Sequence, residues 1–481
     1  MTGESEEVTD PGEDKFANSK TKGVETLLGD PKKAIIKLSI PMIIAMSVQT
    51  IYNLVDALWV SGLGPDALAA VGLFFPFFFI LIAIATGIGV GAGAALSRRI
   101  GAKDKEGSDN VAIHSLLMMM GASLVLVAVF LPLTRSMFSA IGATGDVLEM
   151  TVQYSQIMFA AAPLLFFMNW ATAIMRGEGN VTRPMWAMTV GSVVNMILDP
   201  IFIYTLDMGV AGAAWATVVA ILVTAAPLAY WMFVKADTYV TIQRCCFSYS
   251  REIVNDIMKV GLPAAVMQLA MSISMLFLNL IIVSVGGTDG VAVFTSGWRL
   301  VMIGIMPLIG IAMAVTSVSA AAYGAREYGK LTIAFHYAVR LGFIIELFVA
   351  ASVFLLAPQI AAMFSMGEGG ERIQDDIEGF LRIIVIFFPS TAFGMFSSAL
   401  FQGTGKGLYA LAVTIVRTVI LAVMFAILLS TVLGFGLTGV WWGMVIGNTG
   451  GSIIAFTWAR YYISRLNGEP ELVGAPKPLP D

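Results

Sequence analysis

Two carboxylic acids lie inside long apolar stretches of this sequence, where charge is costly. Asp56 lies in QTIYNLVDALWV and Asp199 lies in SVVNMILDPIFIY. An ionisable group at the centre of a membrane-spanning helix costs about 2.5 to 3.5 kcal/mol on insertion scales, so it is a functional candidate by default. Two such acids placed close together repel each other and could hold a proton between them. With neutral oxygen ligands, they could instead bind a hard cation.

Polar residues accompany both acids at helical spacing. Tyr52 and Asn195 each precede an acid by four residues, so each pair shares a helix face. Gln49 extends the first stripe by one turn. Counted from the ends of their apolar stretches at about 1.5 Å per residue, both acids lie roughly 5–12 Å below the same surface, and Thr217 reaches a similar depth. The spacing therefore predicts one layer of oxygen-bearing side chains that binds H⁺ or Na⁺. Its predicted members are Tyr52, Asp56, Asn195, Asp199 and Thr217, and the Na⁺ ligands among them would be Asp56, Asn195, Asp199 and Thr217. The alternative is that each acid makes only a buried hydrogen bond between helices.

The composition places these elements in a membrane. Of 481 residues, 58% are hydrophobic and 12% are charged, whereas soluble domains carry about 25% charged residues. A span needs about 20 mostly apolar residues. Twelve stretches qualify: 35–60, 69–97, 111–133, 149–174, 184–206, 210–234, 252–286, 290–320, 331–357, 378–402, 407–432 and 437–462.

Short basic loops fix the orientation. Lys and Arg cluster at the ends that include Lys32, Arg98 and Arg176, and the opposite loops offer few basic residues beyond Arg135, Arg372 and Arg382. By the positive-inside rule, both termini are cytoplasmic. The net charge of −4, without a basic block, gives no reason to expect nucleic acid binding. The adjacent cysteines Cys245 and Cys246 form no disulfide framework or metal motif.

The chain contains two related halves. IKLSIP at 36–41 corresponds to MKVGLP at 258–263, RGEG at 176–179 to QGTG at 402–405, and GVAGAAW at 209–215 to GLTGVWW at 436–442, with offsets of 222 to 227 residues. We therefore expect an all-α integral membrane protein with twelve transmembrane helices in two six-helix lobes, related by a pseudo-two-fold axis along the membrane normal. Only the first half carries the acids, because the repeat aligns Asp56 with Leu278 and Asp199 with Ala426.

The predicted organisation has five parts. Residues 1–31 form a disordered cytoplasmic tail, 32–235 the first lobe with the cation site, 236–251 a cytoplasmic linker, 252–465 the second lobe, and 466–481 a second cytoplasmic tail.

The motifs around the acids are similar to those of a known family. YNLVD followed by WVSGLG, RGEG after the fourth span and LDPIFIY in the fifth resemble the multidrug and toxic compound extrusion transporters, and most of all the archaeal members of the DNA-damage-inducible-F-like branch. The likeness runs from about Gly29 to Arg465. It implies a monomer in the plasma membrane with a central cleft, surrounded by membrane lipids. It also implies export of small organic cations or amphiphilic drugs in exchange for Na⁺ or H⁺, with no other cofactor.

The resemblance also implies roles for particular residues. The family's cation site falls on Asp56, Asn195, Asp199 and Thr217, with its tyrosine at Tyr52. The sequence departs from the family at Thr172, where relatives carry an asparagine; Asn169 lies one turn earlier. We expect the substrate cleft to include Gln49, Asn53, Asn169 and Thr172. Pro41 is a candidate hinge in the first span, although Pro263 at the matching position leaves an architectural role open.

Other function classes fit less well. No phosphate-binding loop is present, so energy would come from an ion gradient, and no catalytic cluster indicates an enzyme. A flippase for lipid-linked precursors of the same superfamily is the main alternative, but it would be expected to carry basic residues in its cavity. Glu346 and Arg417 are further charges within spans, for which structural roles are favoured.

Overall fold

The computed structural model describes residues 20–242, 248–365 and 370–468. Within these ranges every regular element is helical. The first half comprises α2 (Lys22–Leu28), α3 (Pro31–Ser61), α4 (Pro65–Gly101), α5 (Lys105–Ala140), α6 (Gly145–Ala160), α7 (Ala162–Gly177), α8 (Thr182–Pro200) with a π-helical end (Ile201–Thr205), and α9 (Gly209–Ala229) with a π-helical end (Tyr230–Val234).

The second half has corresponding elements. It comprises α10 (Arg251–Gly324), α11 (Tyr328–Phe364), α12 (Gln374–Ile384), α13 (Phe388–Gly403), α14 (Gly407–Ile415), a π-helical segment (Val416–Leu421), α15 (Ala422–Ile427), a second π-helical segment (Leu428–Val432) and α16 (Gly436–Gly468).

These helices confirm the twelve predicted spans. Nine helices of the described chain are long and apolar enough to cross a membrane, and α6 and α7, bent by 46° to each other, form a tenth span. The α10 helix is broken at Gly287, whose φ of +57° is left-handed, so its 74 residues make two spans. The α16 helix, with 33 residues, completes the twelve.

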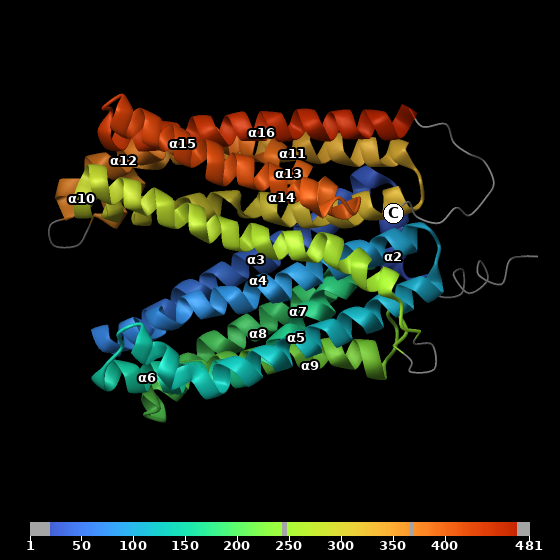
Figure 1. Cartoon of the computed structure of the whole chain (residues 1–481), viewed down its shortest axis with the longest axis horizontal. Coiled ribbons are helices and arrows are strands. Elements are labelled where there is room, and N and C mark those ends of the chain that lie inside the picture. The colour runs from blue at the N-terminus through green and yellow to red at the C-terminus, as the bar shows by residue number, and fades with distance from the viewer. Residues whose placement is uncertain (1–19, 243–247, 366–369, 469–481) are drawn as a thin grey trace, which may run out of the picture.

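The two lobes meet at one end of the molecule and diverge toward the other. In Figure 1, α4 to α9 lie below and α10 to α16 above, and the groups converge at the right, where α2 and the end of α16 lie. We call this the terminal end and the opposite one the far end. Glycines permit the convergence: a Cβ on Gly91 would lie 2.2 Å from the carbonyl oxygen of Ile257, and one on Gly101 would lie 2.0 Å from that of Ala321. Backbones this close leave no room for a side chain.

A buried arginine connects the lobes at the terminal end. Arg98 on α4 pairs with Asp256 on α10 at 2.7 Å and donates from Nη1 to the Gly403 carbonyl at 3.0 Å. Its side chain is almost fully buried. One residue of the first lobe thus binds two separate elements of the second.

The short helix α2 lies inside the predicted tail over 1–31, so that prediction is wrong for residues 22–28. Thr21 caps the helix by accepting a hydrogen bond from the Val24 N–H, and Val24 and Leu27 are buried on one face. An apolar pair three residues apart after a capping threonine is enough to dock a single amphipathic turn. Residues 1–19 lie outside the described part of the chain.

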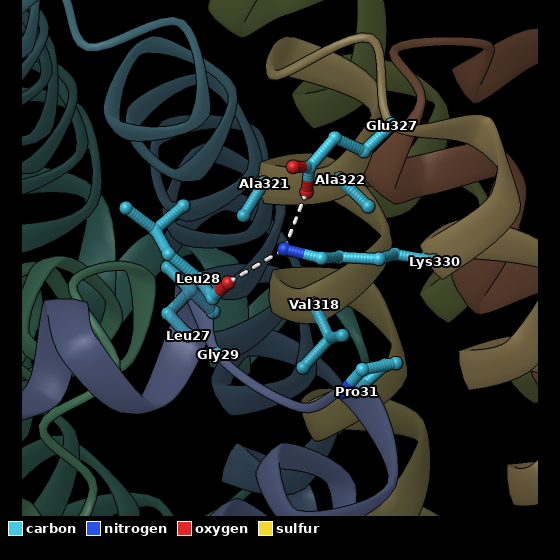
Figure 2. Close-up of a pocket in the computed structure, with 9 residues that line it drawn as sticks. All are labelled: Leu27, Leu28, Gly29, Pro31, Val318, Ala321, Ala322, Glu327 and Lys330. Carbon is cyan, nitrogen blue, oxygen red and sulfur yellow. Dashed lines mark hydrogen bonds and ion pairs between the residues drawn. The ribbon is translucent and has the colours of Figure 1, made fainter.

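Helix α2 contacts both lobes. Figure 2 shows the Lys330 side chain of α11 reaching α2, where Nζ donates to the Leu28 carbonyl at 3.0 Å while pairing with Glu327 at 2.7 Å. On the first lobe, a Cβ on Gly23 would lie 2.7 Å from the Glu178 carbonyl oxygen. The lysine thereby satisfies a carbonyl left free at a helix C-terminus.

The boundaries of the second lobe differ slightly from the predicted ones. The α10 helix begins at Arg251, the last residue assigned to the linker, and α16 continues past 465 to Gly468. Helix ends of this kind are uncertain by a few residues when read from hydropathy alone. Cys245 and Cys246 lie outside the described residues, as does the second predicted tail beyond 468.

Candidate functional site

Three helices of the first lobe meet around the two acids. The α3 helix carries Tyr52 and Asp56, α8 carries Asn195 and Asp199, and α9 carries Thr217. The α8 helix packs against both α3 and α9. Both acids lie within two turns of the far ends of their helical spans, so the structure brings the five predicted residues into one layer.

The two acids contact each other directly. The carboxyl groups of Asp56 and Asp199 are within hydrogen-bonding reach. A hydrogen bond between two carboxyl groups requires that one of them carry a proton, because an ionised carboxylate only accepts. A hydrogen bond between these two groups would therefore place one proton between them.

Asn195 orients this pair. In the amide orientation that satisfies both neighbours, its nitrogen donates to Asp199 Oδ2 at 2.9 Å and its oxygen accepts from the Thr217 backbone N–H at 3.2 Å. The Thr217 hydroxyl donates to the Ala213 carbonyl at 3.0 Å and contacts Tyr52. Asn195 thus presents a donor, not an oxygen, to the carboxyl pair.

Burial divides the layer into two parts. Asn195 and Asp199 are 0% exposed, and Asp199 Oδ1 has no protein partner. Tyr52 and Asp56 on α3 are only half-buried. Asp56 is therefore the more exposed acid of the pair, and Asp199 is enclosed by protein.

An apolar layer separates the acids from the far end. Val60, Ile203 and Ala213 form a cluster, joined by Trp59 and Tyr154. Val60 and Ile203 lie four residues beyond Asp56 and Asp199, and Ala213 four before Thr217 on the oppositely directed α9, so each is one turn closer to the far end. We call this cluster the outer plug. The Tyr204 hydroxyl, on the π-helical end of α8, donates to the Trp59 carbonyl at 2.6 Å and connects α8 to α3.

In the described part of the second lobe, apolar residues lie at the positions that match the two acids. Leu278 and Ala426, the repeat partners of the acids, are 4% and 0% exposed within an apolar cluster that includes Phe294 and Trp441. The Phe294 and Trp441 rings stack at 5.9 Å. Hydrocarbon occupies the positions where the first lobe has acid.

The predicted cleft residues lie apart from this layer. Gln49 is half-buried and Asn53 is exposed on α3. On α7, the Asn169 side chain donates to the Leu165 carbonyl at 2.9 Å and Thr172 is buried. Among the described residues, no hydrogen bond is seen between these four side chains and the two acids. Pro41 lies within α3, which continues through it as one helix.

Three further residues are of interest: Tyr154, which was not predicted, and Glu346 and Arg417, which could have paired with each other or with Arg299. Tyr154 of α6 lies close enough to Asp56 and Asp199 to sense their charge, and only its place in the polar sequence TVQYSQ could have indicated this. Glu346 is fully buried with no partner for either oxygen. Arg417 donates to Asn448 at 3.2 Å, so these two charges do not pair with each other.

The layer around Asp56 and Asp199 offers a metal ion only two carboxyl groups. The described residues contain no group of three or more His, Cys, Asp or Glu side chains that could hold a metal ion. A Na⁺ ion would have to use two carboxyl groups and neutral oxygens, of which the Asn195 oxygen already accepts from Thr217.

Twelve apolar spans in two lobes, joined at one end and divergent at the other, define a membrane transporter of the two-lobe type. The chain belongs to the MatE family, because the sequence model of that family matches residues 41–201 and 263–428. The two matched segments begin at Pro41 and Pro263, in agreement with the predicted duplication.

Curated and solved relatives agree with this assignment. The chain is 27% identical over 418 residues to the multidrug export protein MepA of Staphylococcus aureus strain NCTC 8325, covering 87% of this chain and 91% of that protein. It is 51% identical, with a TM-score of 0.91, to an outward-facing multidrug resistance MATE family transporter of the MOP superfamily, covering 93% and 99% of the two chains. A MOP superfamily transporter from Pyrococcus furiosus, described as having a binding pocket whose reversed polarity suggests a different function, matches at 51% identity and a TM-score of 0.90, over 93% and 99%.

Proposed function

We propose that this chain is a multidrug efflux antiporter that exports organic cations in exchange for H⁺ by alternating access. The MepA relatives support the drug export part of the proposal. The coupling part is supported by the carboxyl pair, which the first lobe has and the matching positions of the second lobe lack. At the matching positions, the second lobe has the apolar side chains of Leu278 and Ala426. A packing role shared by both lobes therefore does not explain the acids.

The single observation that carries the coupling is the contact between Asp56 and Asp199. Two acids that share one proton release it when a cation or a change of surroundings stabilises the doubly charged pair. Asn195 donates to Asp199 and spends its oxygen on Thr217, which favours H⁺ over Na⁺ as the ion bound. Na⁺ would need that amide reversed.

The arrangement of the lobes suggests the order of events. The terminal end is closed by Arg98 and by close glycine contacts, and we assign it to the cytoplasmic side because the short basic loops lie there. This corresponds to an outward-facing state, the state of the relative described above. Since the outer plug blocks direct access from the far end, we propose that protons reach Asp56 from the cleft side of α3.

Proton binding would then drive substrate release. A protonated pair no longer attracts an organic cation, so the two ligands compete through charge. Gln49, Asn53, Asn169 and Thr172 remain the proposed substrate contacts, and Pro41 the proposed hinge. The complete layer lies within one chain, so we propose that the transporter acts as a monomer in the cell membrane.

Gradient-driven dye transport tests this proposal. The purified chain in liposomes is given ethidium, with pH and Na⁺ gradients imposed separately. We expect the pH gradient alone to drive transport, and Asp56→Asn and Asp199→Asn to weaken coupling by about 5- to 150-fold, the usual range of coupling free energies. Asp66→Asn, which removes an exposed acid at the far end, is the matched control. Full coupling in Asp56→Asn would refute the proposal.

A flippase for lipid-linked precursors is the second candidate, favoured only by the reversed pocket polarity described for the Pyrococcus relative. In the same liposomes, inhibition by a lipid-linked oligosaccharide but not by organic cations would support it over drug export.

A further inference from the structure

A pocket lies at the terminal end, where the first lobe meets the second and away from the acids. It is an open pocket of about 320 Å³ where the start of α3 faces α11. Pockets that take small ligands begin at about 300 Å³. The residues that line it are Lys32, Thr332, Ile333, His336, Tyr337 and Arg340.

The pocket is basic and uncompensated. Lys32, Arg340 and His336 can all carry positive charge, and no acid lines the pocket. Among the described residues, neither Lys32 nor Arg340 has a carboxylate within ion-pair distance. Both side chains are exposed.

Several cations at this end have carboxylate partners among the described residues, whereas Lys32 and Arg340 have none. The paired cations at this end include Arg98 with Asp256, Arg99 with Asp104, Lys105 with Asp109 and Lys330 with Glu327. Tyr337 also lines the pocket, whereas the Thr332 hydroxyl already donates to the Tyr328 carbonyl at 2.8 Å. Two cations without carboxylate partners beside a tyrosine hydroxyl suit a phosphate group.

Apolar stripes continue from the pocket along both helices. On α3, Ile36, Ile40 and Ile44 follow Lys32 at intervals of four residues, and all three are exposed. On α11, Ile344 is 64% exposed one turn beyond Arg340. Side chains of this kind on a spanning helix face lipid. A soluble anion would make no use of them, whereas a phospholipid has both a phosphate and acyl chains.

We propose that this pocket binds the phosphate of an anionic phospholipid in the leaflet at the terminal end, with its acyl chains along the isoleucine stripes of α3 and α11. Basic pockets between transmembrane helices are a recurrent site for anionic headgroups. Lys32 and Arg340 bind the charge, and the Tyr337 hydroxyl adds a hydrogen bond. The site is independent of the proposed transport activity.

Lipid competition on the purified, full-length protein tests the proposal. Native mass spectrometry from mixed micelles would compare bound phosphatidylglycerol with phosphatidylcholine. Each basic side chain near a headgroup contributes about 1 kcal/mol, or roughly fivefold. We therefore expect Lys32→Gln with Arg340→Gln to lose roughly 30-fold in preference for phosphatidylglycerol, and the charge-conserving Lys32→Arg with Arg340→Lys to retain most of it.

The matched control is Lys33→Gln with Arg465→Gln, which removes two exposed charges from the same end but not from the pocket. We expect it to keep the lipid preference. Equal losses in both double variants, or none in Lys32→Gln with Arg340→Gln, would overturn the proposal. Glycerol 3-phosphate and inorganic phosphate form a further arm: displacement of phosphatidylglycerol by either at millimolar concentration would show a soluble-anion site and would also overturn it.

Discussion

At the residue scale, the chemistry of this chain is concentrated in one hydrogen-bonded group. Asp199 is held by Asn195 from within the lobe and by Asp56 from the half-exposed side. A buried carboxyl group with an unused oxygen is costly unless it is neutral or is shared with a partner. The contact with Asp56 is what makes such a residue tolerable inside a lobe that is otherwise apolar.

Asn195 and Thr217 can be distinguished by substitution. Asn195→Ala removes a hydrogen bond to a charged group, which is worth about 1.5 to 3 kcal/mol, so we expect a loss in gradient-driven transport of roughly 10- to 100-fold. Thr217→Val keeps the backbone N–H that donates to the Asn195 oxygen and removes only a neutral hydroxyl. We therefore expect gradient-driven transport to fall by less than about tenfold. The measurement is initial ethidium flux in liposomes under a pH gradient.

The same pair of variants also identifies the coupling ion. If Na⁺ were ligated by the Thr217 hydroxyl, Thr217→Val would be as damaging as Asn195→Ala and would raise the Na⁺ concentration needed for half-maximal transport. That outcome would contradict the proton assignment, while leaving the drug export proposal standing.

Much of this layer could be predicted from spacing, because Tyr52 with Asp56 and Asn195 with Asp199 are local pairs on single helices. Tyr154 could not, because its approach depends on how α6 packs beside the site. The amide orientation of Asn195 was equally inaccessible, since it is set by the Thr217 N–H of another helix.

At the scale of elements, the linker between the lobes is held by side chains of the first lobe. The N–H groups of its residues 239, 241, 248 and 250 donate to Glu178, Asp109, Asn110 and His114, at 2.7 to 3.1 Å. A segment without regular secondary structure makes no repeating backbone hydrogen bonds, so these side chains accept hydrogen bonds from its N–H groups instead. Glu178 is the most constrained of them: it is fully buried, and its Oε1 has no partner.

Burial raises the pKa of Glu178 to about 7 from its ordinary 4.5, against the opposing hydrogen bonds from the linker backbone. The folded state therefore holds a proton that unfolding releases between these two values. We expect stability to fall by about 1.4 kcal/mol per pH unit from about pH 4.5 to 7 and to level off above, measured as thermal unfolding of the purified protein between pH 5 and 8.

Glu178→Gln should flatten that slope. Asp237→Asn is the control, because the bond to Arg183 lowers the pKa of Asp237 and places its titration below the tested range. It should lower stability at every pH without changing the slope. A slope unchanged in Glu178→Gln would show that another group is responsible.

The sequence predicted the spans well and the connections poorly. Each span can be recognised from about 20 consecutive apolar residues. The 46° bend between α6 and α7 and the packing of α2 depend instead on contacts between residues far apart in the chain. RGEG was recognised as a repeat landmark, and nothing in those four residues shows that the linker and α2 pack around Glu178.

At the scale of the whole molecule, duplication and asymmetry coexist. The repeat offsets predicted two lobes, and the family match begins at equivalent prolines in each. Which end of the lobes is closed could not be predicted, because it depends on contacts such as that of Arg98 with Asp256, between residues 158 positions apart. Such contacts are the ones that alternating access must break.

Arg98 should therefore control the equilibrium between closed and open terminal ends. Arg98→Gln removes the ion pair with Asp256 and weakens the bond to the Gly403 carbonyl. A hydrogen bond involving a charged group is worth about 1.5 to 3 kcal/mol, so we expect a shift of roughly 10- to 100-fold toward the open terminal end. Electron–electron distance measurements between spin labels on the terminal ends of α4 and α10 would report it. Arg183→Gln breaks a two-point pair with Asp237 that lies within the first lobe and linker, and should leave those distances unchanged. If Arg98→Gln left these distances unchanged as well, the glycine contacts alone would keep the terminal end closed. Gly91→Ala would then be the variant that opens it, because the added Cβ would collide with the Ile257 carbonyl.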